Sequence, residues 1–260
     1  MQPGLRRWLC GLACLAVAAA VAGGLSASTP EPRVQRLTEA VLTDHTQPGA
    51  PTKTVSLPDA WEHTAPSRDG RASYRIALPD DALATEQPAL FLRRVGNVFR
   101  VQFNGEPVLS VGELRRPLPN YGQEPHLLRL PRHLVRATDN ELVIDVIGEP
   151  RREAGLSSVW VGPAAGLEPM YEWAMNLQVR GAWVLTSTSA TLGALALLVA
   201  WRTRQMVYGW FGLGNLIWAW RVSALHLHDP GPWAAVLHWM FELSYSLFVA
   251  CMGMFLLMLV

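Results

Sequence analysis

Charged residues are nearly absent from the last third of this 260-residue chain. From position 181 to the end, the charged side chains are those of Arg202, Arg204, Arg221, Asp229 and Glu242. The stretch from 29 to 178, by contrast, carries 16 Lys and Arg and 19 Asp and Glu, a net charge of −3. A polar segment followed by an apolar one argues against a single soluble globule. Since the chain has no basic stripe, a nucleic-acid partner is excluded.

Three apolar runs follow one another in the second segment, at 181–201, 206–225 and 234–260. The first has 21 uncharged residues, and a helix of that length spans about 31 Å, the thickness of a hydrocarbon core. Trp and Tyr residues near the ends of the runs are typical of the membrane interface. We therefore expect three transmembrane helices in a lipid bilayer. The last run has no basic flank, which predicts that the sequence is the N-terminal portion of a longer, truncated chain.

The orientation in the membrane follows from the basic residues. Arg202 and Arg204 lie in the link between the first two runs, whereas the link at 226–233 has no Lys or Arg. The positive-inside rule places the first link in the cytoplasm, so the polar segment lies outside.

The N-terminus predicts the same topology. Two arginines precede an apolar run at 8–25, and small residues follow it. This pattern indicates a secretory signal peptide over 1–28, with an uncleaved N-terminal anchor as the alternative.

The polar segment predicts a β-sandwich. Residues 29–54 are rich in Pro, Thr, Ala and Gln and are expected to form a linker or a loosely attached strand. Between 55 and 168, apolar residues alternate with polar ones in several short runs, and Asn104-Gly105 marks a two-residue hairpin turn. The clearest alternating sets are Tyr74, Ile76 and Leu78; Phe99, Val101 and Phe103; and Leu142, Ile144 and Val146. Residues 169–180 are expected to connect the sandwich to the membrane.

Several short motifs in this order resemble a known domain. They are Leu57-Pro58-Asp59-Ala60-Trp61, Ser73-Tyr74-Arg75, Val101-Gln102-Phe103-Asn104-Gly105, Leu130-Pro131 with Asp139-Asn140-Glu141-Leu142, and Gly155-Leu156-Ser157. Together they resemble the jelly-roll, galactose-binding-like domain of family-two glycoside hydrolases, and even more the version fused to bacterial membrane sensors. Tyr208-Gly209-Trp210-Phe211 with Trp218-Ala219-Trp220-Arg221 resembles the second helix of bacterial seven-transmembrane receptors with diverse intracellular signalling modules.

The resemblance implies the sensory portion of a multi-pass receptor in the bacterial inner membrane, with residues 29–180 in the periplasm. The output it implies is a two-component sensor histidine kinase, with a diguanylate cyclase as the alternative. A membrane-anchored carbohydrate-binding or glycan-processing envelope protein is a further alternative. The resemblance implies no cofactor in this portion, and ATP and Mg only in a kinase domain beyond it. The expected partners are a small ligand such as a carbohydrate, or a periplasmic protein, and a second copy of the chain.

No catalytic motif is present, so we expect no catalytic residue here. His126 and His133 lack a third ligand at metal spacing, so we expect no metal site. A ligand site on the sandwich would combine an aromatic face with polar groups. The candidates are Arg116, Asn120, Tyr121, Trp61 and Trp160. The alternatives are core or edge packing for both tryptophans, and a loop aromatic covering the end of the sandwich for Tyr121.

Two charged residues inside the apolar runs form a second candidate site. Arg221 lies near the outer end of the second run, and Glu242 lies about two turns into the third. Because a charge within a membrane helix normally finds a partner, we expect an intramembrane Arg221–Glu242 pair, with snorkelling of Arg221 as the alternative. His226 and His228 in the outer link could report external pH, or could simply be solvated.

Overall fold

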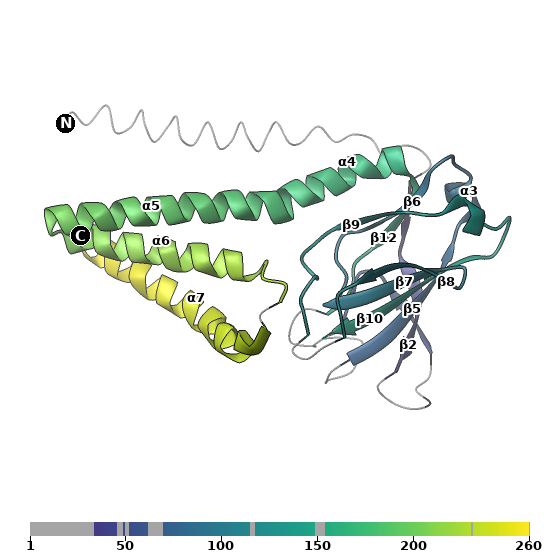
Figure 1. Ribbon diagram of the computed structural model, residues 1–260, viewed down its shortest axis with the longest axis horizontal. Coiled ribbons are helices and arrows are strands. Elements are labelled where there is room, and N and C mark those ends of the chain that lie inside the picture. The colour runs from purple at the N-terminus through teal and green to yellow at the C-terminus, as the bar shows by residue number, and fades with distance from the viewer. Residues whose placement is uncertain are drawn as a thin grey trace. The chain divides into compact units, whose positions relative to one another are not determined.

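The computed structural model describes residues 34–45, 49, 52–61, 70–114, 118–148, 154–229 and 231–259. The predicted signal peptide or anchor at 1–28 lies outside this range. The described residues form two antiparallel sheets followed by long helices (Figure 1). This confirms a β-sandwich followed by helices.

The larger sheet has six antiparallel strands in the order β3-β2-β5-β10-β7-β8. In that order they are Lys53–Ser56, Glu39–Asp44, Gly70–Leu78, Asn140–Gly148, Val98–Phe103 and Glu106–Val111. The predicted alternation is observed, since Tyr74, Ile76 and Leu78 of β5 are buried on one face. Asn104 and Gly105 both have positive φ in the turn from β7 to β8, as a two-residue hairpin of this kind requires.

The smaller sheet has four strands in the order β1-β12-β6-β9. In that order they are Gln35–Leu37, Val159–Pro163, Pro88–Leu92 and His126–Arg129. A separate pair joins β4 (Asp59–Ala60) to β11 (Gly155–Leu156), and two short helices are α3 (Asp80–Leu83) and η1 (Arg132–Leu134). The core lies between the two sheets, where Leu90, Leu92 and Val161 of the smaller sheet meet Tyr74 and Ile144 of the larger.

Of the two expectations for 29–54, the linker is wrong for the described part of this stretch, which forms strands. That part contains β1, β2 and the start of β3. Ala40 and Leu42 of β2 are buried, and the strand pairs with β5. Two inward-facing apolar residues form too short an alternating pattern to predict a strand. In addition, the residues of β5 that stabilise β2 by pairing lie about 30 positions further along the sequence.

A single helical segment continues the chain after β12. It runs over Ala164–Thr203 as α4 (Ala164–Met175), the π-helical turn η3 (Asn176–Arg180) and α5 (Gly181–Thr203). The connector expected at 169–180 is therefore helix, and the last strand of the sandwich ends at Pro163. After a left-handed residue at Arg204, α6 (Met206–Ala224), η4 (Gly231–Trp233) and α7 (Ala234–Leu257) follow.

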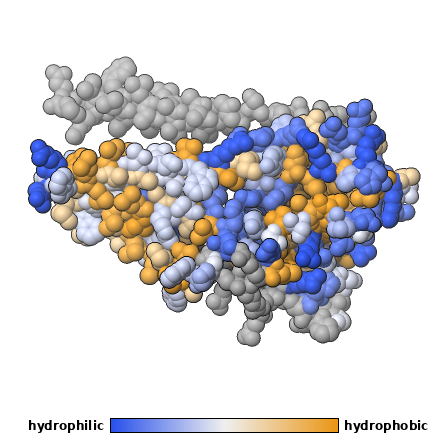
Figure 2. Space-filling view, in the orientation of Figure 1, coloured by the Kyte–Doolittle hydropathy of each residue, from blue (hydrophilic) through white to orange (hydrophobic). Residues whose placement is uncertain are grey.

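Two of these helical segments, Ala164–Thr203 and Gly231–Leu257, are long and apolar enough to cross a membrane. Many apolar side chains of α5 and α7 are exposed, Leu195 and Leu243 among them, and Figure 2 shows hydrophobic residues spread over the helical part of the chain. The helix expected at 206–225 forms as α6 but is not one of the two.

Helix α6 packs against both α5 and α7 through glycines (Figure 1). A Cβ atom on Gly212 of α6 would lie 2.8 Å from the carbonyl oxygen of Gly193 on α5, and one on Gly193 would lie 2.9 Å from that of Gly212. A Cβ atom on Gly214 would meet Met252 of α7. Small residues that let backbones approach closely are typical of helix association in membranes.

We expect Gly212→Ala to weaken the contact between α5 and α6. The new methyl group must push apart two backbones, and overpacking of this kind costs about 1–3 kcal/mol. The measurement is reversible unfolding of the chain in mixed detergent micelles. Gly253→Ala in α7 is the control, because nothing lies within 4 Å of its Cβ position and alanine favours a helix by about 1 kcal/mol. Equal effects of the two substitutions would contradict close packing at Gly212.

Candidate functional site

Asn120 and Tyr121 lie in a sandwich loop whose shape depends on buried Asn97. The Asn97 side chain donates a hydrogen bond to Asn120 Oδ1 at 3.2 Å, and the Asn97 carbonyl accepts one from the Tyr121 backbone at 3.1 Å. Asn120 Oδ1 also accepts a bond from the Gly122 backbone at 3.2 Å. Asn97 is 1% exposed, so this loop is attached to the interior of the sandwich.

The same loop contacts the link between α6 and α7. The Asn120 backbone N–H donates to the His228 carbonyl at 2.8 Å. The Tyr121 ring stacks on the His228 ring with centroids 4.8 Å apart and planes 14° apart. His228 Nε2 lies 2.9 Å from Glu124 Oε1. Two of the predicted ligand residues therefore join the sandwich to the helices.

A second contact joins the end of α6 to the π-helical turn. His226 Nδ1 lies 3.1 Å from the Val222 carbonyl oxygen, and Nε2 lies 3.1 Å from that of Gln178 in η3. The His226 ring also lies beside Trp183, with centroids 6.1 Å apart. Turns of π-helix inside α-helices are frequent at functional sites. Both loop histidines thus make specific contacts and are not simply solvated.

Helix α4 covers the outer face of the smaller sheet. Ala89 and Phe91 of β6 point to this face and form a second apolar cluster with Ala164, Leu167 and Ala174 of α4. At the edge of the cluster, Arg129 and Glu168 form an ion pair at 2.7 Å. The Arg93 guanidinium lies 5.7 Å from the centre of the Trp173 ring. The helix that continues into α5 is therefore fixed to the sandwich.

Both tryptophans proposed as ligand residues are packing residues. Trp61 is 1% exposed, and its Nε1 donates to Tyr74 Oη at 2.6 Å. Tyr74 Oη in turn donates to Asp59 Oδ2 at 2.6 Å, and burial followed by this bond raises the pKa of the Tyr74 phenol. Trp160 is partly buried beside the α4 cluster, with the Arg36 guanidinium 5.8 Å from its ring. Arg116 lies outside the described residues.

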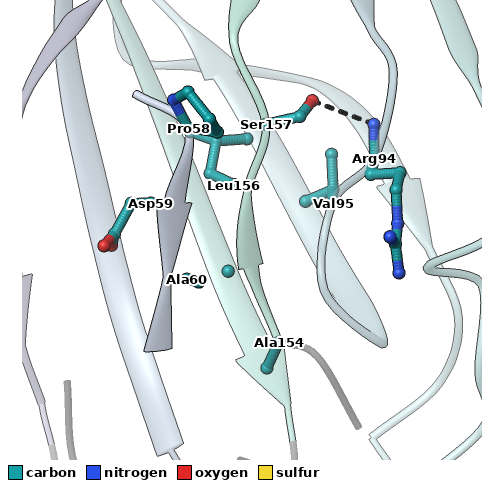
Figure 3. Close-up of a pocket in the computed structure, with 9 residues that line it drawn as sticks. Pro58, Asp59, Ala60, Arg94, Val95, Ala154, Leu156 and Ser157 are labelled. Atoms are coloured by element: carbon teal, nitrogen blue, oxygen red, sulfur yellow. Dashed lines mark hydrogen bonds between the residues drawn. The ribbon is translucent and has the colours of Figure 1, made fainter. Parts of the chain in front are cut away.

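The sandwich has a surface cavity that the sequence did not predict. It has a volume of about 360 Å³ and is lined by Pro58, Asp59, Ala60, Arg94, Val95, Ala154, Gly155, Leu156 and Ser157. Figure 3 shows Asp59 and Arg94 on opposite sides, and the Ser157 hydroxyl accepts a bond from the Arg94 backbone at 2.9 Å. A lining that combines arginine and serine with apolar residues suits a small polar ligand.

The cavity contains none of the predicted ligand residues. Another hollow, of about 470 Å³, lies over the β7–β8 hairpin and is lined by Arg100, Gln102, Pro107, Val108, Leu109 and Ser110. Within the described ranges, no three His, Cys, Asp or Glu side chains gather as a metal site would need.

The predicted Arg221–Glu242 pair does not form in the described structure. The Arg221 guanidinium donates to the Phe241 carbonyl at 2.6 Å and to Ser244 Oγ at 3.1 Å, and lies 4.0 Å from the centre of the Phe241 ring. Residues 241, 244 and 245 share one face of α7, and Tyr245 also contacts Arg221. Glu242 is turned away by about 100° and is exposed. Helical phase, which the sequence analysis did not apply to this pair, decides the partner of Arg221.

We expect Arg221→Met to lower the stability of the packed helices by about 1–2 kcal/mol, since polar contacts between membrane helices contribute about that much. Glu242→Gln is the matched control and should change stability by less than about 0.5 kcal/mol, as is usual for an exposed residue. Unfolding in mixed micelles measures both. A larger loss for Glu242→Gln than for Arg221→Met would contradict the observed partners.

The sandwich should lose stability in acid through His126. Burial lowers the pKa of this imidazole, an effect that the nearby Glu124 opposes. The folded state therefore holds the ring neutral, so its stabilising contribution is present above about pH 6.5, the ordinary histidine value, and is lost as the pH falls below it.

We expect His126→Phe to reduce the fall in stability between pH 7 and pH 5. The new ring can pack against Phe99, whose ring centre lies 4.9 Å from that of His126. Pulse proteolysis of the sandwich in urea, with the full chain in nanodiscs, provides the readout. His133→Phe, at an exposed position, should retain the wild-type acid response. If the stability of His126→Phe fell between pH 7 and pH 5 as much as that of the wild type, His126 would not be the source of the acid response.

Comparison with known proteins adds only to the description of the sandwich. No family model matches the chain, and no curated protein matches it. Several solved structures are similar over about half of the chain. A β-glucuronidase from Ruminococcus gnavus is 16% identical with a TM-score of 0.38 over 49% of this chain and 28% of its own.

Two further structures give similar values. A β-D-mannosidase from Dictyoglomus thermophilum is 9% identical with a TM-score of 0.37, covering 50% of this chain and 22% of its own. A glycosyl hydrolase family 2 member from Bacteroides cellulosilyticus is 15% identical with a TM-score of 0.39, covering 50% and 20%. This chain thus spans less than a third of the length of each.

Proposed function

We propose that this chain is the input portion of a bacterial membrane signalling receptor. In this proposal the sandwich is periplasmic, the helices lie in the inner membrane, and the turn with Arg202 and Arg204 faces the cytoplasm. The output is a sensor histidine kinase, with a diguanylate cyclase as the alternative. The two long apolar helices support a membrane location, and the polar sandwich supports an aqueous one for the first half.

The unbroken helical path from the sandwich into α5 carries this proposal. Strand β12 ends at Pro163 and α4 begins at the next residue. Leu167 of α4 is fully buried against the outer face of β6. A helix that is packed on the sheet and continues into α5 can transmit a tilt or rotation of the sheet, whereas a flexible anchor could not.

The cavity beside β11 provides a place where binding could act on this path. Its wall at 154–157 is followed directly by β12, which starts at Val159 and leads into α4. Arg94 and Val95, which pair with this wall through Leu156 and Ser157, come just after β6, the strand beneath α4. A ligand or partner protein that binds two poses of these strands with different affinity would shift the pose of α4.

The test is a fusion of residues 1–260 to the catalytic region of a histidine kinase with measurable autophosphorylation. Leu167→Ala loosens α4 from the sheet, because removing a buried leucine side chain costs about 2–5 kcal/mol. We expect it to change basal autophosphorylation at least threefold in membranes. Leu177→Ala is the control, since Leu177 is 58% exposed.

Pulse proteolysis of the same membranes verifies that the sandwich stays folded in both variants. Equal autophosphorylation in wild type, Leu167→Ala and Leu177→Ala, with the sandwich folded, would contradict signalling through α4 and favour helices that serve only as an anchor.

A further inference from the structure

Both nitrogen atoms of the His226 ring face carbonyl oxygens. Nδ1 lies 3.1 Å from the oxygen of Val222 and Nε2 lies 3.1 Å from that of Gln178. A carbonyl oxygen only accepts hydrogen bonds, and a neutral imidazole carries a single N–H. The two bonds can therefore exist together only when the ring holds two protons and is positively charged.

His228 faces a carboxylate and an aromatic ring. Its Nε2 lies 2.9 Å from Glu124 Oε1, and its ring stacks on Tyr121. Protonation turns the first contact into an ion pair, in which both the donor and the acceptor carry a charge. It also places a cation over the face of Tyr121, which is attractive.

The charged groups around these rings favour the same state. The sandwich contributes Glu124, and the loop itself contributes Asp229, whose Oδ1 accepts a bond from the Gly231 backbone at 3.1 Å. The nearest cation of the π-helical turn, Arg180, is bonded to Glu172 at 2.9 Å and to Asn176 at 2.6 Å. Among the described residues, the rings that lie beside the two histidines are the uncharged rings of Trp183 and Tyr121.

We propose that the segment 225–229 is a proton-dependent clasp that holds the sandwich loop at Asn120–Glu124 and the π-helical turn to the end of α6. In the closed clasp each histidine ring holds two protons and is positively charged. In the open clasp each ring has released one proton and is neutral. Because the hydrogen bonds of the closed form need these added protons, acidification closes it and alkalinisation opens it. The proposal goes beyond the signalling role, because it needs neither an output domain nor a bound ligand.

The test measures the distance between spin labels at Ser110→Cys on the sandwich and Pro232→Cys beside the clasp, both at exposed positions. The full chain is used in nanodiscs, with its own three cysteines replaced by serine. At pH 5.5 we expect one narrow distance, and at pH 8 a second, broader population that makes up at least a third of the molecules. The same pair of labels in His226→Gln/His228→Gln should give the broad population at both pH values.

Two further variants keep the test decisive. His133→Gln, at an exposed site away from the clasp, should retain the full pH response. His228→Lys places a permanent cation opposite Glu124 and should restore part of the narrow population at pH 8. An identical distribution at pH 5.5 and pH 8, or a pH response that survives in the double glutamine variant, would overturn the proposal. Either result leaves the autophosphorylation test unaffected, so the two proposals can fail separately.

Discussion

The burial of strand β6 on both faces is the contact on which the rest of this structure depends. Leu90 and Leu92 point into the core between the sheets, while Ala89 and Phe91 point outward and pack on α4. A strand covered on both faces is rich in apolar residues without alternation, and every residue of the sequence Pro-Ala-Leu-Phe-Leu is buried. Without α4, the outer face of β6 would be an apolar patch exposed to water.

This contact explains how a water-exposed sandwich and an apolar helix pair can act together. The end of α4 leads into α5 through η3, and the same region is bonded by His226 from the end of α6. The loop at Asn120 and Tyr121 attaches the sandwich to the helical part a second time, through His228. This loop is separate from α4 in the sequence. Two attachments at separate points restrict rotation as well as separation, and relative motion of the two halves must then break one of them.

Local sequence patterns predicted those strands that can be recognised without knowing which other strands they pair with. The alternation in β5, β7 and β10 and the Asn104-Gly105 turn follow from backbone geometry alone, and the structure confirms them. Strand β2 was missed because its stability comes from pairing with β5. The partner of Tyr121 was missed because His228 lies 107 positions away in the sequence.

Long-range packing also determines whether the candidate site residues lie in the core or at the surface. An aromatic residue looks the same in sequence whether it faces a ligand or the core, and Trp61 faces the core. The cavity beside β11 is lined by three segments that lie far apart in the sequence, so no single segment could have revealed it.

The central claim is that the sandwich and the apolar helices share one continuous, packed helix. Hydrogen exchange of the full chain in nanodiscs, resolved by peptide, tests this claim most directly. The account predicts slow exchange without interruption from Val159 to Thr203, including the π-helical turn. Exchange of residues 164–180 at the rate of an unfolded chain, while the sandwich and α5 remain protected, would contradict it.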